Sequence, residues 1–246
     1  MKTPFAQLKG NARERLLGNY GPIILAFLLT EIIAMILNAP FQQMMEEGTM
    51  VMNAPRILMA GLGMIIVSLV TVILGTGYNY MHLKLARGQR PRVSDLFYAF
   101  KNRPDRYIGY AIFLTFISLL CILPGTICLI FAMAAGTDLF SNPALLIAGI
   151  VLMILGCIIL IILVLSWSLS IYLLLDDPTL SVMAAFKESS QLMKGNKFRL
   201  FALELSFLGW AILGLLSFMI GFLWISPYLN QTMIQFYLDL TSRSAA

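Results

Sequence analysis

Charged residues are scarce in this sequence: they make up 12% of its 246 residues, whereas hydrophobic residues make up 59%. A soluble domain contains roughly 25% charged residues. So few charges cannot cover the surface of a soluble fold of this length, and lipid must therefore surround much of the protein. The composition predicts a polytopic, all-α membrane protein.

Histidine and cysteine are also rare. His82 is the only histidine, which argues against a zinc or iron site built on histidine. Cys121, Cys128 and Cys157 lie inside apolar runs and imply no disulfide framework. The sequence contains no HExxH, CxxC, Walker A or GxSxG motif. We therefore expect a protein that is not an enzyme and that has no metal site and no cofactor.

The positive charges follow a pattern along the chain, although the net charge is only +5. All lysines and arginines except Arg56 lie within residues 2–15, 84–106 and 187–199 or at Arg243. Loops that stay in the cytoplasm are rich in Lys and Arg. This pattern predicts that both termini are cytoplasmic, and it disfavours nucleic acid as a partner.

The apolar runs predict six transmembrane helices in three hairpins within one polytopic domain that covers residues 1–246. The spans are expected at about residues 22–37, 57–80, 107–135, 144–175, 198–218 and 222–240. A short amphipathic interfacial helix is expected before each hairpin. The run 107–135 exceeds one straight crossing, so either a kink at Pro124 or a re-entrant segment is expected there.

Asparagines mark the hinge between each interfacial helix and its hairpin, at Asn19, Asn102 and Asn196. Gly18 and Gly195 precede two of them and suit a left-handed helix end. The glycines of the second span (Gly61, Gly63, Gly75 and Gly77) are interpreted as sites of close helix contact. Three aspartates are interpreted as caps rather than as catalytic groups: Asp95, Asp176 and Asp177.

Six segments carry a family resemblance, and they occur in order along nearly the whole chain: RERLLGNY, LARGQRPRVSDLFYAF, ILPG, LLDDP, SSQLMKGNKFRLFALELSFLGW and IGFLWISPYLNQTMIQFYLDL. With them the chain resembles the bacterial integral-membrane family catalogued as domain of unknown function 975. The resemblance implies a multi-span protein of the bacterial cytoplasmic membrane. It implies no established activity.

Two acids lie inside apolar runs. Glu31 is near the middle of the first expected span, and Glu204 is about eight residues past the third hinge. An ionised residue at the centre of a span costs about 2.5–3.5 kcal/mol, so each acid is expected to be protonated, paired or facing water. Each marks either a proton or cation site or a structural hydrogen bond between helices. Trp210 completes the candidate buried polar site, although packing against a neighbouring helix is the better explanation of this residue.

The cationic segments supply candidate residues for binding anionic lipid headgroups, namely Lys194, Lys197, Arg199, Arg103 and Arg106. Three hypotheses follow for function. The first is a small transport or membrane-partner protein with the buried acids inside its bundle. The second is a structural or regulatory scaffold that binds lipid or another membrane protein through its basic amphipathic helices. The third is a lipid-processing enzyme.

Overall fold

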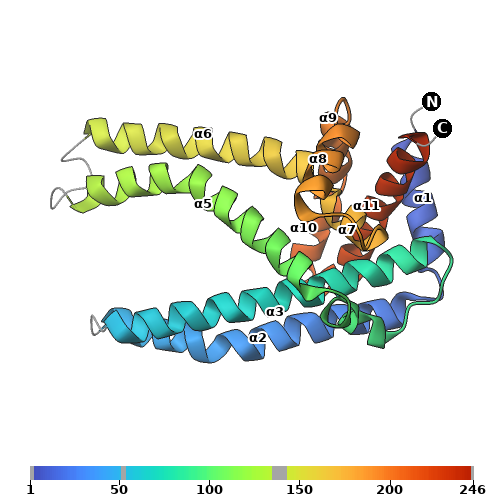
Figure 1. Cartoon of the computed structure of the whole chain (residues 1–246), viewed down its shortest axis with the longest axis horizontal. Coiled ribbons are helices and arrows are strands. Elements are labelled where there is room, and N and C mark those ends of the chain that lie inside the picture. The colour runs from blue at the N-terminus through green and yellow to red at the C-terminus, as the bar shows by residue number, and fades with distance from the viewer. Residues whose placement is uncertain (1–2, 51–53, 135–142, 245–246) are drawn as a thin grey trace.

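The computed structural model describes residues 3–50, 54–134 and 143–244, and every regular element in these ranges is a helix (Figure 1). The prediction of an all-helical chain is therefore confirmed for these ranges. The elements are α1 (Phe5–Leu16), α2 (Tyr20–Met50), α3 (Ala54–Ala86), η1 (Val93–Phe97), α4 (Tyr98–Lys101), α5 (Pro104–Ala134), α6 (Pro143–Trp167), α7 (Ser170–Asp176), α8 (Val182–Leu192), α9 (Lys197–Leu205), α10 (Leu208–Leu216) and α11 (Phe222–Ser244).

Two long hairpins dominate the molecule. Helix α2 packs along α3, and α5 packs along α6. Both hairpins leave a common base formed by the shorter helices, and they diverge from each other away from it (Figure 1). Helix α5 runs through Pro124 to Ala134 without interruption, and it bends along its length. This course agrees with the kinked alternative for the third span.

Glycines bring the paired helices together, as expected for a membrane bundle. A Cβ on Gly156 would overlap the carbonyl oxygen of Cys121, so α6 approaches the backbone of α5 there. A Cβ on Gly77 would overlap the carbonyl oxygen of Leu96 in the same way. Of the four glycines expected to allow close contact, Gly63 and Gly77 do so, whereas Gly61 and Gly75 face open space.

Five helices in the described ranges are long and apolar enough to cross a membrane, and several such helices make this a membrane-embedded protein. They are Tyr20–Glu47, Ala54–Ala86, Pro104–Ala132, Pro143–Asp176 and Lys197–Leu216. The expected sixth span, residues 222–240, lies within α11, which is not among these five. Helix α2 also continues through Pro40 to Met50, well beyond the expected end at residue 37.

The fourth of these apolar stretches is broken between α6 and α7. The buried Ser189 of α8 lies at the break: its Oγ donates to the carbonyl oxygen of Ser166 (2.9 Å) and accepts from the backbone N–H of Leu169 (3.3 Å). The break leaves backbone N–H and C=O groups without partners inside the helix, and buried groups of this kind need hydrogen bonds. The side chain of Ser189, from another helix, supplies them.

The three predicted hinges coincide with helix ends. Helices α1, α4 and α8 end just before them, and Gly18 and Gly195 have φ angles of +79° and +72°. Asn19, Asn102 and Asn196 each donate a side-chain hydrogen bond to the carbonyl oxygen four residues earlier, at 3.3, 2.9 and 3.0 Å. The second hinge has no glycine, and Arg103 takes the left-handed conformation with φ +52°. The same local geometry therefore recurs before α2, α5 and α9.

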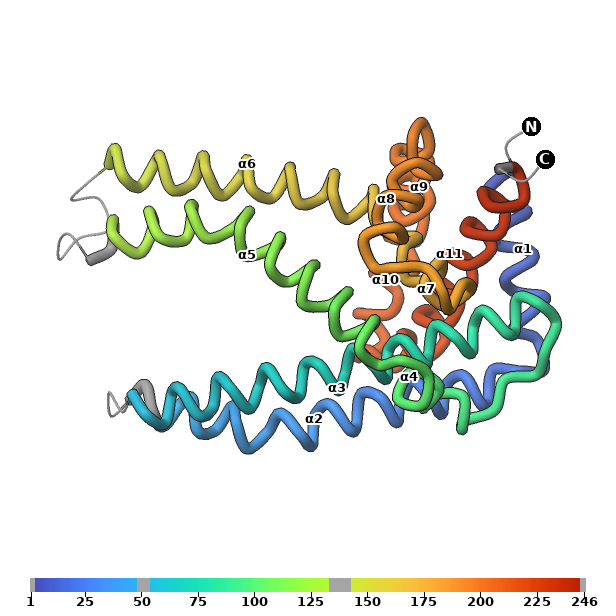
Figure 2. Tube along the Cα trace, in the orientation of Figure 1, coloured from blue at the N-terminus to red at the C-terminus, as the bar shows by residue number. Residues whose placement is uncertain are grey.

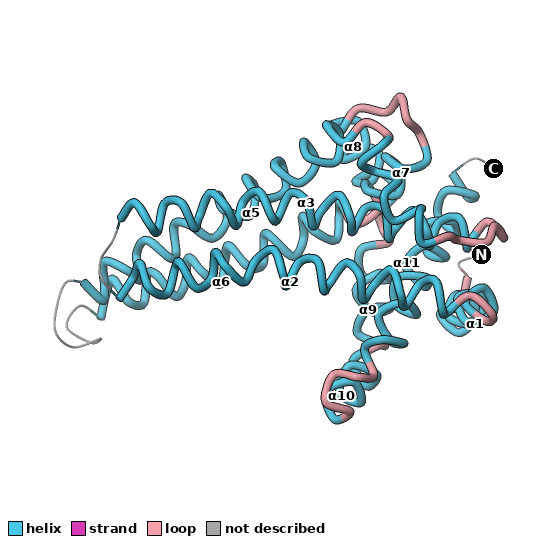
Figure 3. The backbone as a smooth tube through the Cα atoms, turned by 90° about the horizontal axis from the view of Figure 1, so that it is seen from below, coloured by secondary structure: helices cyan, strands magenta, loops and turns pink. Residues whose placement is uncertain are grey.

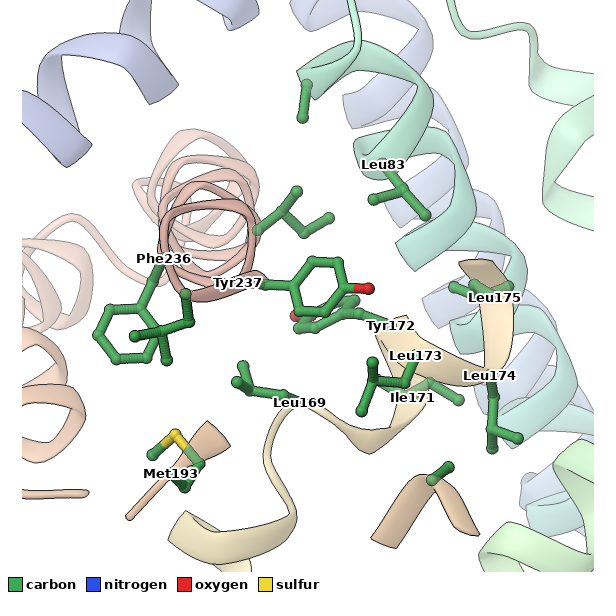
Figure 4. Packing of buried hydrophobic residues seen from close by; sticks show 14 of the residues in the cluster. Leu83, Leu169, Ile171, Tyr172, Leu173, Leu174, Leu175, Met193, Phe236 and Tyr237 are labelled. Atoms are coloured by element: carbon green, nitrogen blue, oxygen red, sulfur yellow. The ribbon is translucent and has the colours of Figure 1, made fainter. Parts of the chain in front are cut away.

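The largest hydrophobic core lies in the base rather than between the long hairpins. Helix α7 contributes a continuous buried run, Ile171–Leu175, and Tyr172 lies beside Tyr237 of α11 (Figure 4). Helix α1 buries Leu8, Ala12 and Leu16 on one face and packs against α11 (Figure 2). Seen from below, α10 projects away from the long hairpins (Figure 3). The base therefore joins the helices of the molecule at one end, and the two long hairpins extend from it.

Candidate functional site

The candidate site is the polar base built around α11. This helix packs against α1, α2, α3, α8 and α10. Its C-terminal half carries polar side chains that sequence hydropathy treats only as interruptions of an apolar run. In the structure, Gln231, Tyr237 and Asp239 of α11 contact partners on distant parts of the chain.

Asp239 of α11 joins the two ends of the chain. Its carboxylate accepts hydrogen bonds from Arg199 Nη1 at 2.9 Å, from Arg243 Nη2 at 2.7 Å and from Thr3 Oγ1 at 2.5 Å. The side chains of Arg199 and Asp239 are only 9% and 10% exposed. Burial by itself raises the pKa of Asp239, but the hydrogen bonds from Thr3 and Arg199 outweigh it and hold the pKa below 3.8. The carboxylate is therefore ionised at neutral pH.

A second acid ties α7 to α3 and α11. Asp176 accepts a hydrogen bond from the Tyr237 hydroxyl at 2.5 Å and one from Arg87 Nη2 at 2.6 Å. Burial, and then the hydrogen bond to Asp176, raise the pKa of Tyr237, because both disfavour the phenolate. Tyr237 is therefore a neutral donor. The expected cap role of Asp176 is wrong: its oxygens serve side chains from two other segments.

A third contact is buried completely. His82 of α3 and Gln231 of α11 are both fully buried, and Nδ1 of His82 lies 2.8 Å from Oε1 of Gln231. Tyr78 packs edge-on against the His82 ring at 4.7 Å. The Nε2 atoms of His82 and Gln231 and the hydroxyl of Tyr78 have no protein partner. Buried polar atoms of this kind are commonly satisfied by internal water.

The other two aspartates expected to act as caps behave locally. Asp95 accepts from the backbone N–H of Arg92 at 2.8 Å, which confirms its cap role, and it also pairs with Lys84 at 2.8 Å. Asp177 accepts from the backbone N–H of Thr179 at 2.7 Å and forms a turn, and it does not cap the helix that follows, because the N-cap of α8 is Ser181. The hydrogen bonds from Thr179 lower the pKa of Asp177, and burial has little effect on this pKa.

The structure separates the residues of the sequence-predicted polar site. Glu204 lines a groove of about 460 Å³ between α9–α10 and α11, whose other lining residues are almost all apolar. Glu31 is exposed on α2 and does not line that groove. Trp210 is 43% exposed and contacts Tyr228 edge-on at 6.3 Å. The three candidates therefore do not meet in one cavity.

The candidate headgroup residues divide into two kinds. Arg199 is used in the Asp239 contact, and the buried Arg106 donates to the carbonyl oxygens of Asp177 (2.9 Å) and Leu180 (2.5 Å). These two arginines hold the base together. Arg103 is exposed and lies 3.6 Å from Asp105, Lys194 is exposed, and Lys197 is half-buried at the start of α9.

Sequence reasoning missed Asp239, Tyr237, Gln231 and Thr3, the residues on which the base depends. Each lies near an end of the chain or in a helix whose hydropathy is low for a membrane span. The one signal in the sequence was an excess of polar residues in the segment NQTMIQFYLDL. Chemically, the arrangement can hold helices together and can retain water, and its hydroxyl–carboxylate pairs, Thr3 with Asp239 and Tyr237 with Asp176, join distant segments of the chain.

Comparison with known proteins gives a family match but no activity. No curated protein and no solved structure matches the chain. A family model described as "Protein of unknown function (DUF975)" matches residues 1–244. The chain belongs to this family.

Proposed function

We propose that this protein is a non-catalytic membrane protein that binds a transmembrane helix of another polypeptide through its long hairpins. The observation that carries the proposal is the openness of the bundle. In the most apolar stretch of each of the five long apolar helices, only 6% to 28% of the residues are buried inside the structure. Membrane helices associate through close van der Waals contact, and these hairpins reserve most of their surface for contacts outside the chain.

Helix α5 supplies the most specific surface. A groove of about 380 Å³ runs along it, lined by Leu114, Thr115, Ser118, Leu119, Ile122, Leu123 and Thr126. Cys121 and Gly125 contact α6 on another face of the same helix. Ser118 and Thr126 bond to carbonyl oxygens of their own helix, so these two hydroxyls stay paired against an apolar partner. Small and hydroxyl side chains are typical of interfaces between membrane helices.

Transport is the second candidate function, and the observation in its favour is that the acid Glu204 lines a groove. A transport path needs polar groups that continue from one side of the membrane to the other. The groove around Glu204 is apolar, and Glu31 stands apart from it, so support for transport is weaker. A lipid-processing enzyme has the least support, because the base offers structural hydrogen bonds rather than a catalytic set.

For the orientation, we propose a bacterial cytoplasmic membrane with both termini on the cytoplasmic side. The hydrogen bonds from Thr3 and Arg243 to Asp239 support placing the two ends on one side. The cation-rich segments 3–15, 84–106 and 187–199 belong to the base, and such segments favour the cytoplasmic face.

Site-specific photo-crosslinking in native membranes tests the proposal. A photoreactive residue placed at Ile122, in the α5 groove, should give a discrete crosslinked band that contains a second polypeptide. The same residue placed at Leu120, which is 61% exposed but does not line the groove, is the matched control and should label lipid. Equal labelling of lipid at both positions would contradict partner binding. The double variant Glu31→Gln/Glu204→Gln should leave the Ile122 crosslink unchanged. Loss of the crosslink in this variant would favour transport.

A further inference from the structure

A small aromatic slot lies where α1 and the start of α2 meet the α10–α11 pair. Its volume is about 130 Å³, and its lining residues are Arg13, Tyr20, Trp210, Trp224, Ile225 and Tyr228. A water molecule occupies about 30 Å³ of liquid, so the slot has room for about four waters, or for one phosphate-sized group. It is distinct from the groove on α5, and it adjoins the groove that holds Glu204, with which it shares Ile225.

Two cations of α1 stand over the aromatic rings beside this slot. Lys9 and Arg13 are one helical turn apart and therefore share a face. The Lys9 ammonium lies 4.3 Å from the ring centre of Phe207, and the Arg13 guanidinium lies 6.0 Å from the ring centre of Tyr228. Phe207 and Tyr228 themselves pack edge-on at 5.2 Å. The two positive charges thus converge on adjoining rings.

Lys9 and Arg13 differ from three other cations of the base, which have carboxylate partners. Lys84, Arg87 and Arg199 each pair with an aspartate at 2.6–2.9 Å. Within the described ranges, neither Lys9 nor Arg13 has a carboxylate partner, and Lys9 donates only to the carbonyl oxygen of Ser206 at 3.2 Å. Burial lowers the pKa of Lys9, because it removes water without supplying an opposite charge. An anion beside Lys9 and Arg13 would balance the charge.

We propose that the slot binds the phosphate of an anionic phospholipid, with Lys9 and Arg13 donating to its oxygens. A lipid fits better than free phosphate because the walls are aromatic and open outward: Trp210 is 43% and Trp224 is 51% exposed. Leu17, directly after α1, and Leu213 on α10 are exposed, and acyl chains can continue there. Trp and Tyr prefer the depth of the headgroups in a bilayer. The site is separate from the cations suggested by the sequence and does not depend on the proposed partner.

Quenching of tryptophan fluorescence by lipids with brominated chains tests the site in reconstituted vesicles. The chain has three tryptophans, two of them in the slot, while Trp167 packs against Phe113 and Phe186. Brominated phosphatidylglycerol is compared with brominated phosphatidylcholine at equal mole fraction. Two basic residues should give an about 30-fold preference for phosphatidylglycerol, at about a fivefold contribution each. Equal quenching by the two lipids in the native protein would overturn the proposal.

Variants separate the slot from general attraction by the basic surface. Lys9→Gln and Arg13→Gln should each reduce the preference about fivefold, and the double variant should abolish it. Arg13→Lys should retain it, which keeps the test valid should the loss of both charges impair folding. The exposed cations Lys101 and Lys187 are the matched controls, and Lys101→Gln/Lys187→Gln should retain the full preference.

Two further measurements identify the source of the anion and the place of contact. In a Trp210→Phe/Trp224→Phe variant, the remaining Trp167 should be quenched equally by both lipids. A preference that survives in this variant would place the effect outside the slot and overturn the proposal. Inorganic phosphate added to the vesicles should not relieve quenching in the native protein. Relief by phosphate alone would show that the slot recognises the free anion rather than a lipid.

Discussion

Replacing Asp239 by asparagine should destabilise the protein more than any other single change from acid to amide in the base. The substitution keeps the shape of the side chain but removes the charge that faces Arg199. Because the Arg199 side chain is only 9% exposed, its guanidinium would be left buried without an opposite charge. Removing one partner of a buried ion pair typically costs about 3–5 kcal/mol. Arg243 is 31% exposed, so its share of the loss is expected to be small.

Unfolding of the purified protein in mixed micelles by increasing sodium dodecyl sulfate measures this cost. Asp105→Asn is the matched control, because Asp105 and its partner Arg103 are 67% and 62% exposed at a separation of 3.6 Å. Such surface pairs contribute about 0–1 kcal/mol. If Asp239→Asn shifts the transition no further than Asp105→Asn does, the buried pair does not hold the base, and our reasoning is refuted.

The pH dependence of the same pair gives an independent check. The pKa of Asp239 is lower in the folded protein than its ordinary value of 3.8, so the folded state binds its proton less readily. The stabilisation is therefore complete well above pH 3.8 and is lost as the pH falls below 3.8 and through the folded-state pKa. The difference in stability between the native protein and Asp239→Asn should shrink over that range. A difference that stays constant would contradict the assignment.

Three further predictions concern the other contacts of the base. Gly77→Ala should cost about 1–3 kcal/mol or more, because its methyl group would overlap the carbonyl oxygen of Leu96; Gly75→Ala, where the space is open, should not destabilise, and thermal unfolding of the two variants compares them. Tyr237→Phe should cost about 1.5–3 kcal/mol in the same unfolding assay, since it removes a hydrogen bond to the Asp176 carboxylate; an unchanged transition would contradict that hydrogen bond. Gln231→Leu should cost about 1–3 kcal/mol by leaving His82 unpaired, whereas His82→Leu/Gln231→Leu should cost less than the sum of its single variants; strict additivity would show that the two side chains do not interact.

Local features of the fold could be predicted from the sequence, because their causes are local. The pair Gly-Asn at residues 18–19 and 195–196 predicts a left-handed helix end, and both glycines have positive φ angles. The long apolar runs predict helices that can cross a membrane, and the described ranges contain five stretches that are long and apolar enough to do so. The cap role of Asp95 was equally accessible, since its partner Arg92 is three residues away.

The pairing of distant side chains could not be predicted in this way. Lys197 and Arg199 are equivalent in the sequence, two cations beside a hinge, yet only Arg199 meets an aspartate 40 residues away. Thr3 and Asp239 are 236 residues apart and touch because α1 and α11 pack together. No periodicity or spacing encodes such a contact. The same holds for the aromatic slot, whose walls come from three separate segments of the chain.

Helix α11 explains why hydropathy alone misjudges this protein. Asn, Gln, Thr and Asp side chains are costly in lipid unless they are paired, so a segment that carries several of them reads as a poor span. In the structure Gln231 and Thr232 are fully buried, and Asp239 is 10% exposed within its ion pairs, so lipid never meets these groups. The partners of these polar groups are Thr3, which precedes α1, and residues of α3, α7 and α9, so α11 buries its polar groups by packing among those segments. The last helix of the chain thus closes the base, and it leaves the two hairpins held at one end and open along the rest of their length.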